Sequence, residues 1–236
     1  MPGLPKPRNG IQLDMASPLV QGLVGCWLLN EGGGKKAVDL IGNNHLNLDA
    51  NCYYDGNGIR TANSPYYWTQ SQPNVPAALI DTAFTVMSRF IPIDTSATYL
   101  PFMSVRSNLG TCWEMRNDTS TMAAFAIYRT NGGWTEATLN SVLTVGKAVT
   151  FIAVFTSTSA TLYASSTNAI GSITFADTTV GNIAGSSTSY FAIGGDAYYH
   201  YATGYSLPCS HSAAMLWGRA LSVNEVKLLM DLTAGW

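Results

Sequence analysis

The chain has 236 residues, a net charge of -2 and an isoelectric point near 5.8. It is long enough to bury one large core, and it has no basic field that would attract nucleic acid or an anionic membrane surface. Charged residues make up 11% of the sequence, against about 25% in ordinary soluble domains. Two interpretations are open: an extracellular-type β domain, or a surface that packs widely against protein neighbours, because charge is depleted at interface cores.

The N-terminal segment contains prolines and basic residues but no apolar core of a secretory signal peptide. The longest strongly apolar run, Ala148–Phe155, is far too short to span a bilayer. We therefore expect a soluble protein made in the host cytoplasm, with no membrane insertion. The cysteines form no Cys-x-x-Cys pair and are expected to be free thiols: Cys26, Cys52, Cys112 and Cys209.

Residues 1–20 contain Pro2, Pro5, Pro7 and Pro18 and show little periodicity. Because proline fixes φ and removes a backbone donor, we expect an extended N-terminal arm over residues 1–20. The arm is either a frayed tail or a strap that lies on a partner protein. The remaining residues, 21–236, are expected to form one domain.

Strand patterns recur at short intervals from Gly22 onward. The first, Gly22–Leu29, is a continuous apolar run, which is typical of a strand buried on both faces. Glycine-rich turns punctuate the runs, and no helical pattern intervenes between them, so the sequence predicts an antiparallel β-sandwich. The further predicted strands are Phe84–Ile91, Tyr99–Val105, Cys112–Arg116, Met122–Tyr128, Ala148–Phe155, Ala160–Ala164, Gly171–Phe175, Phe191–Gly194 and His211–Trp217.

One short helix is predicted near the C-terminus, over about Val223–Leu232. Ser222 and Glu225 have the spacing of a capping box, in which each side chain satisfies the other residue's backbone N–H. Val226, Leu229 and Met230 then form one apolar stripe that can pack on a sheet.

Two segments at opposite ends of the chain resemble one superfamily. The segment GLVGCWLLNEGGGKKAVDLIGNNHLNL (Gly22–Leu48) resembles the opening of concanavalin A-like lectin/glucanase domains of the laminin G-like type. The segment MLWGRALSVNEVKLLM (Met215–Met230) resembles their closing strand and short helix, and Gly146–Ala164 is similar to their paired central strands. The resemblance implies an all-β jelly-roll sandwich over residues 21–236.

The form of the opening motif is also similar to versions found in bacteriophage and prophage structural proteins. This resemblance implies a protein of the virion, such as a capsid decoration protein of the cement or head-fibre type, or a tail adhesin. It further implies the major capsid protein or other virion proteins as partners, and a homo-oligomer on the particle.

Catalytic residues of related glycanases are not reproduced. Retaining hydrolysis needs two carboxyl groups about 5–5.5 Å apart, and the nearest candidates are Glu114 and Asp118. Arg116 lies between them on the same strand face and is expected to pair with both carboxylates and keep them ionised. His45, His200 and His211 accompany no Gly-x-Ser-x-Gly nucleophile motif, so we expect a protein that is not an enzyme.

Calcium is the ion that the resemblance allows, and no other cofactor is expected. Calcium needs six to eight oxygen ligands, more than any single segment provides. The same residue types are preferred in turns, so turn formation is the alternative role. The candidate ligands are Asp39, Asn43, Asn44, Asp55 and Asn57.

Aromatic residues are the candidates for a binding surface. Consecutive aromatic residues cannot all face the core of a strand, because side chains alternate between its faces. They can stack on sugars, anchor a protein interface or simply pack within the domain. The candidates are Tyr66, Tyr67, Trp68, Trp134, Tyr198, Tyr199 and Tyr201.

The sequence thus favours a virion accessory protein that acts through protein–protein contacts on a bacteriophage capsid. The alternative is a glycan-binding adhesin module, on a phage tail or a secreted particle, that recognises a cell-surface glycan. A glycoside hydrolase is the remote alternative.

Overall fold

The computed structural model describes residues 14–42, 44–48, 52–61, 69–71, 83–107, 110–128, 133–156, 159–165, 174–176, 190–195, 206–234 and 236. Its helical segments are η1 (Pro18–Val20), a 3-10 helix, and α1 (Val223–Thr233). Its strands are β1 (Leu23–Trp27), β2 (Lys36–Ala37), β3 (Leu46–Leu48), β4 (Tyr53–Tyr54), β5 (Ile59–Thr61), β6 (Thr69–Ser71), β7 (Ala83–Pro92), β8 (Leu100–Ser107), β9 (Gly110–Asn117), β10 (Ala123–Tyr128), β11 (Trp134–Leu139), β12 (Val149–Thr156), β13 (Ser159–Ala164), β14 (Thr174–Ala176), β15 (Tyr190–Ile193) and β16 (Cys209–Trp217).

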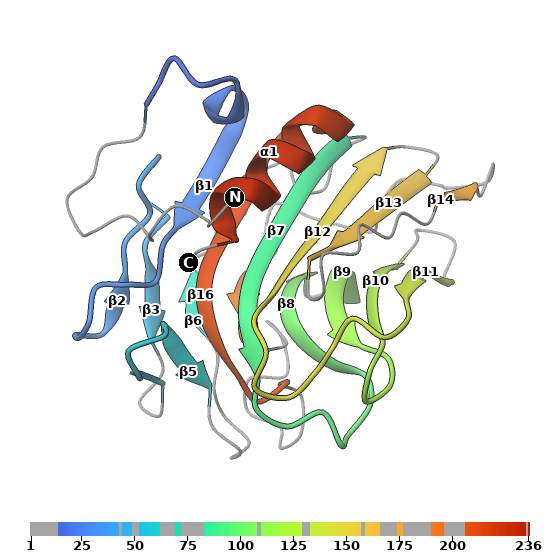
Figure 1. Cartoon of the computed structure of the whole chain (residues 1–236), viewed down its shortest axis with the longest axis horizontal. Helices are drawn as coiled ribbons and strands as arrows, with labels where there is room; N and C mark the ends of the chain where they lie inside the picture. The colour runs from blue at the N-terminus through green and yellow to red at the C-terminus, as the bar shows by residue number, and fades with distance from the viewer. Residues whose placement is uncertain are drawn as a thin grey trace.

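The strands form two antiparallel sheets that face each other (Figure 1). The front sheet has the order β14-β13-β12-β7-β16-β5-β4, with β1 also paired to β16. The back sheet has the order β11-β10-β9-β8-β15-β6-β3-β2. This arrangement, with one short helix near the C-terminus, confirms the predicted all-β sandwich.

Aromatic rings fill the space between the sheets. Phe84 of the front sheet lies 5.9 Å from Trp113 of the back sheet and 4.9 Å from Phe155, measured between ring centroids. Phe90 and Phe102 meet across the two sheets at 4.3 Å. Each fully buried side chain of this size contributes about 1.5–3 kcal/mol to folding, so this layer fixes how the sheets lie against each other.

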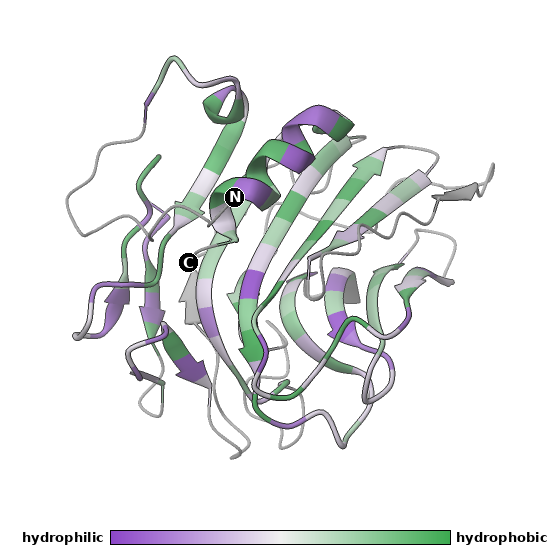
Figure 2. Ribbon diagram, in the orientation of Figure 1, coloured by the Kyte–Doolittle hydropathy of each residue, from purple (hydrophilic) through white to green (hydrophobic). Residues whose placement is uncertain are grey.

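A second apolar layer covers the outer face of the front sheet. Helix α1 lies across that face (Figure 1) and packs Val226, Leu229 and Met230 against strand residues such as Met87 and Trp217. Figure 2 shows the two sides of the helix, one hydrophobic and one hydrophilic. In the described part of the chain, no helix is long and apolar enough to cross a membrane.

The predicted capping box of α1 is confirmed. The hydroxyl of Ser222 accepts a hydrogen bond from the amide of Glu225, whose carboxylate accepts one from the amide of Ser222 at 2.8 Å. Each interaction satisfies a backbone donor that the first helical turn leaves unpaired. Local sequence chemistry therefore determines where this helix begins.

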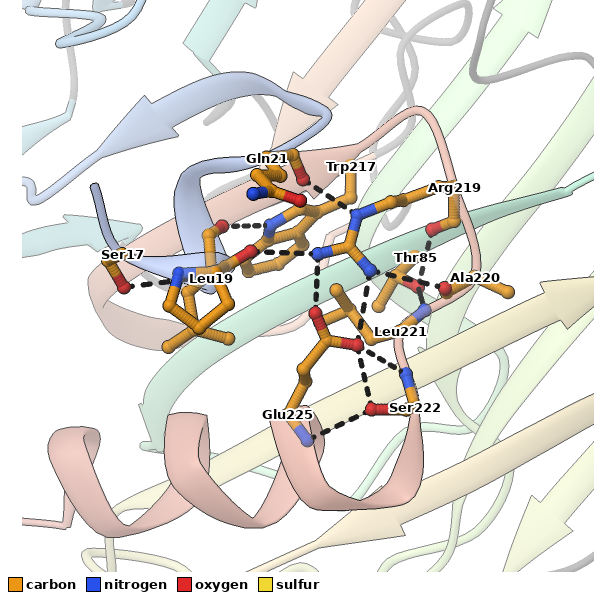
Figure 3. Close-up of polar contacts among 11 residues, drawn as sticks. Ser17, Leu19, Gln21, Thr85, Trp217, Arg219, Ala220, Leu221, Ser222 and Glu225 are labelled. Carbon is orange, nitrogen blue, oxygen red and sulfur yellow. Dashed lines mark hydrogen bonds and ion pairs between the residues drawn. The ribbon is translucent and has the colours of Figure 1, made fainter. Parts of the chain in front are cut away.

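Arg219 joins the N-terminal segment to the start of helix α1 (Figure 3). Its guanidinium donates to the carbonyl oxygens of Pro18 and Gln21 and pairs with Glu225 at 2.6 Å. Beside it, the indole nitrogen of Trp217 donates to the carbonyl oxygen of Leu19 at 2.6 Å. Leu19 itself is buried.

The last residues of the predicted arm, which spans residues 1–20, are therefore not extended. Residues 1–13 lie outside the described residues. Residues 14–17 form a turn, and Pro18–Val20 is a 3-10 helix capped by the hydroxyl of Ser17. The physical reason is that Leu19 gains burial and three carbonyl groups of this segment gain side-chain donors, which an extended strap over Pro18 would not provide.

Candidate functional site

The outer face of the back sheet holds a charged and aromatic cluster on β9, β10 and β11. Glu114 and Arg116 alternate with inward-facing Trp113 and Met115, so both point outward. On β10 they face Ala126 and Ala124, and Glu136 of β11 lies on the far side of Ala126. The small alanine side chains leave room for Arg116 to reach across β10 to Glu136.

Three carboxylates surround the guanidinium of Arg116. Its Nη1 lies 2.6 Å from Glu114, and its Nη2 lies 2.5 Å from Glu136 and 3.6 Å from Asp118. Burial alone would lower the pKa of Arg116, but hydrogen bonding to Glu114 and the three nearby carboxylates raise it overall. The predicted pairing of Glu114, Arg116 and Asp118 is confirmed. Arg106 extends the network, with its Nη2 3.8 Å from Glu114.

Two exposed aromatic rings flank this guanidinium. Its central carbon lies 4.9 Å from the ring centroid of Tyr99 and 5.6 Å from that of Trp134, both within the range of cation–π attraction. Trp134 also packs edge-on against Tyr128 at 5.5 Å. Tyr99 is 57% exposed and Trp134 47% exposed, so both rings present apolar surface beside charged groups. We call Tyr99, Glu114, Arg116, Asp118, Trp134 and Glu136 the Arg116 cluster.

Tyr99 is held in an unusual backbone conformation. Its φ of 59° lies in the left-handed region that L-residues rarely adopt. The amide of Tyr99 donates to the carbonyl oxygen of Asn117 at 2.8 Å, and the buried side chain of Asn117 bonds the backbone on both sides of Tyr99. A strained residue persists only where its surroundings hold it, and such residues gather at functional sites.

The arrangement offers stacking surface and hydrogen-bond acceptors. The exposed rings can pack on the apolar face of a ring-shaped ligand, and Glu136, whose side chain is 38% exposed, can accept hydrogen bonds from its hydroxyl groups. Glu114 and Asp118 are largely covered. Both also pair with the same guanidinium, at 2.6 Å for Glu114 and 3.6 Å for Asp118.

The first group of predicted calcium ligands organises a loop. Both carboxylate oxygens of Asp39 accept backbone N–H groups, those of Cys26 at 2.9 Å, Ile41 at 3.1 Å, Gly42 at 3.2 Å and Asn44 at 3.3 Å. A calcium ion would have to displace these donors, so Asp39 does not fit the role of a ligand. The carbonyl oxygen of Asn44 accepts from the indole of Trp27 at 3.0 Å. Asn43 lies outside the described residues.

The second group forms a tight turn. Asp55 accepts hydrogen bonds from the amide of Asn57 and the hydroxyl of Ser210, both at 2.9 Å. Among the described residues, no group of three or more histidine, cysteine or acidic side chains could hold a metal ion. Calcium therefore remains a prediction that the turn geometry does not require.

His211 is buried in a polar network of the front sheet. Its Nδ1 lies 3.3 Å from the hydroxyl of Ser88 and its Nε2 lies 3.0 Å from the sulfur of Cys209. Burial lowers the pKa of His211 to about 3 and raises that of the Cys209 thiol to about 12. A neutral imidazole and a protonated thiol without solvent access are structural groups. All four cysteines are free thiols, as predicted.

Of the predicted aromatic candidates, the structure places Trp134 on an exposed surface. Tyr66, Tyr67, Trp68, Tyr198, Tyr199 and Tyr201 lie outside the described residues. Ser104, which faces Glu114 across the sheet, donates a hydrogen bond to the carbonyl oxygen of Gly195 at 3.0 Å. Gly195 is the last described residue before the segment that contains Tyr198.

Sequence reasoning missed Tyr99 and Glu136 as members of this surface. A usable signal existed for Glu136. The Asn131-Gly-Gly turn predicts a hairpin, and the two-residue spacing of Trp134 and Glu136 then places both on one strand face. No comparable signal marks Tyr99, because its orientation depends on a positive φ and on Asn117, which is 18 residues away.

No sequence profile of a known family matches the chain, and no curated protein matches it in sequence. Solved structures do resemble it. The botulinum neurotoxin serotype D binding domain superposes with a TM-score of 0.66 at 9% identity, over 90% of this chain and 52% of that chain. For Trypanosoma rangeli sialidase the TM-score is 0.63 at 14% identity, over 91% of this chain and 33% of that chain.

The binding domain of botulinum neurotoxin DC in complex with SialylT superposes with a TM-score of 0.64 at 8% identity, over 90% of this chain and 52% of that chain. The chain thus spans about half the length of the neurotoxin binding domains and about a third of the sialidase. At these identities the likeness shows the fold alone, a β-sandwich of the lectin-like kind. It agrees with the predicted β-sandwich fold.

Proposed function

We propose that this chain is a non-enzymatic glycan-binding module and that the Arg116 cluster is its binding surface. The observation that carries the proposal is the pair of exposed rings, Tyr99 and Trp134, on either side of an ion-paired guanidinium. A pyranose ring has an apolar face for stacking and hydroxyl groups that donate to carboxylates. The exposed rings of the Arg116 cluster can stack on the apolar face, and the carboxylate of Glu136 can accept hydrogen bonds from the hydroxyl groups.

The structural neighbours support this class of function over the others. They include neurotoxin binding domains, one of them in complex with SialylT, and a sialidase. The neurotoxin structures are described as binding domains. The sialidase is an enzyme, and this chain covers only 33% of it. The carboxylates of Glu114 and Glu136 are engaged by Arg116, and carboxylate oxygens accept hydrogen bonds from sugar hydroxyl groups.

A glycan array followed by titration calorimetry tests the proposal. We expect micromolar to millimolar binding to at least one glycan class, reduced about 5- to 10-fold by Trp134→Ala through the loss of one stacking surface. Tyr53→Ala is the matched control, because Tyr53 is 48% exposed and lies on β4 of the front sheet. Equal loss in both variants, or no binding by the parent protein across the array, would refute the proposal.

The place of such a module on a bacteriophage particle, whether on the capsid or the tail, is a proposal that rests on the sequence resemblance. A truncation tests the role of the N-terminal arm, but its end point matters. Deleting residues 1–20 would remove the buried side chain of Leu19 and expose Trp217. Deleting residues 1–13 instead keeps these contacts. We expect this truncation to fold and bind glycan but to be lost from particles. Normal incorporation would exclude an attachment role for the arm.

A further inference from the structure

The Arg116 cluster carries excess negative charge at its surface. Three carboxylates, those of Glu114, Asp118 and Glu136, lie against two guanidinium groups, those of Arg106 and Arg116. Among the described residues, these five groups sum to a charge of about -1 when all are ionised. The most exposed of the five is the carboxylate of Glu136, so an approaching ligand meets an anion first.

Carboxylates of the protein already occupy the guanidinium of Arg116. Its Nη1 bonds Glu114 and its Nη2 bonds Glu136. Its Nε is buried and has no hydrogen-bond partner among the described residues. Recognition of a carboxylated ligand by arginine normally uses two parallel N–H donors of one guanidinium. Here each Nη already donates to a carboxylate of the protein, the Nε–H is buried, and the Arg116 side chain as a whole is only 12% exposed.

Trp134 and Glu136 form one accessible part of the site, beside the exposed Tyr99. They are two residues apart on β11, so their side chains leave the sheet on the same face. A sugar ring stacked on Trp134 would present its edge to the Glu136 carboxylate, which accepts hydrogen bonds from hydroxyl groups but repels another carboxylate.

We propose that this surface selects uncharged sugar rings and rejects sugars that carry a carboxylate, such as sialic and uronic acids. This inference rests on the proposed glycan-binding function and concerns its specificity. In this preference the chain would differ from the binding domain of botulinum neurotoxin DC, which shares its fold at 8% identity and was solved in complex with SialylT.

The test compares matched pairs of oligosaccharides that differ in one acidic group: a galactose-terminated chain with and without a terminal sialic acid, and a glucose oligomer beside its glucuronate counterpart. We expect the neutral member to bind at least 10-fold more tightly. Raising the salt from about 50 to 500 mM should strengthen binding of the acidic member alone, because it screens the repulsion.

The variant Glu136→Gln should gain affinity for the acidic sugars. It keeps the side-chain size and a hydrogen-bond acceptor but removes the exposed charge, so the ratio of acidic to neutral affinity should rise at least 3-fold. Asp231→Asn removes the same charge from the exposed side of α1, on the opposite sheet, and should leave the ratio unchanged.

The outcomes are distinct. Equal or tighter binding of the acidic sugars by the parent protein would overturn the selectivity and leave the glycan-binding function standing. No binding to any member of either pair or to the wider array would overturn both. An unchanged ratio in Glu136→Gln, with the fold verified by its thermal unfolding, would show that Glu136 does not set the preference.

Discussion

The side-chain nitrogen of Asn117 donates a hydrogen bond to the carbonyl oxygen of Ala97 at 2.5 Å, and its side-chain oxygen accepts one from the amide of Leu100 at 2.8 Å. These bonds span Tyr99 and close the loop before β8. Holding Tyr99 at a positive φ costs about 1–2 kcal/mol, which the buried amide of Asn117 offsets. Asn117 is thus a positioning residue for a ring that stacks on Arg116.

Asn117→Ala should lower both stability and glycan affinity. The substitution leaves the carbonyl of Ala97 and the amide of Leu100 without these partners, and the free energy of unfolding should fall by about 1–3 kcal/mol. Affinity should fall about 3- to 10-fold, because Tyr99 is no longer fixed. Urea unfolding and calorimetry measure the two effects separately.

The Tyr99→Ala background distinguishes positioning from general damage. If Asn117 acts through Tyr99, adding Asn117→Ala to Tyr99→Ala should cause no further loss of affinity, although the loss of stability should persist. Additive losses of affinity in the double variant would contradict the positioning role.

A second prediction concerns acid stability and His211. Because burial lowers the pKa of His211 from 6.5 to about 3, the unfolded chain binds more protons than the folded one between these pH values. Stability is therefore fully present above about pH 6.5 and falls as the pH drops toward 3. One such group contributes a slope of at most about 1.4 kcal/mol per pH unit.

The variant His211→Gln isolates this contribution. Gln keeps groups that can bond Ser88 but cannot gain a proton, so its free energy of unfolding should depend less steeply on pH between 6.5 and 4. Urea unfolding at four pH values measures both slopes. Parallel slopes in the parent and the variant would mean that His211 titrates normally in the folded protein.

A third prediction concerns the junction of Arg219 and Glu225. Hydrogen bonding to Arg219, followed by the bonds from Ser222, lowers the pKa of Glu225 from 4.5 to about 2. The stabilisation is present above pH 4.5 and is lost as the pH falls through 2. Since Glu225 remains partly exposed, solvent screening limits the gain to about 1 kcal/mol.

Arg219→Ala should cost more than Glu225→Gln, because Arg219 also donates to Pro18 and Gln21. We expect losses of about 2 kcal/mol and 1 kcal/mol in the free energy of unfolding. Hydrogen exchange at Leu19 and Val20 should rise in Arg219→Ala and stay low in Glu225→Gln. Equal exchange in the two variants would show that Arg219 does not anchor the N-terminal segment.

The sequence predicted the long strands and the helix well, because their signals are local. The capping box at Ser222 and Glu225 needs only four residues, and the apolar run at Ala148–Phe155 matches β12 closely. Strand β11 was not predicted from the sequence. Its outward positions carry Trp134 and the polar Glu136, so the short segment lacks the apolar run that marked the other strands.

The candidate site was harder to predict, since it depends on contacts between distant parts of the chain. The pairing of Glu114 with Arg116 follows from a spacing of two on one strand, and it was predicted. The approach of Glu136 to Arg116 requires the register of β9, β10 and β11 and the small side chain of Ala126 between them. Register cannot be derived from the alternation of polar and apolar residues alone.

A fourth prediction concerns the two glycines of the turn at Asp55, whose presence the backbone geometry accounts for without a metal ion. At Gly58, where φ is 152°, an added Cβ would lie 1.8 Å from the carbonyl oxygen of His211. At Gly56, where φ is 87°, the same atom would meet nothing within 4 Å. Gly58→Ala should therefore destabilise the fold by more than about 3 kcal/mol, because β16 must move. Gly56→Ala pays only the backbone strain of about 1–2 kcal/mol. Thermal unfolding of the two variants, with and without calcium, measures the difference. Equal losses that calcium reverses would instead assign the turn to an ion.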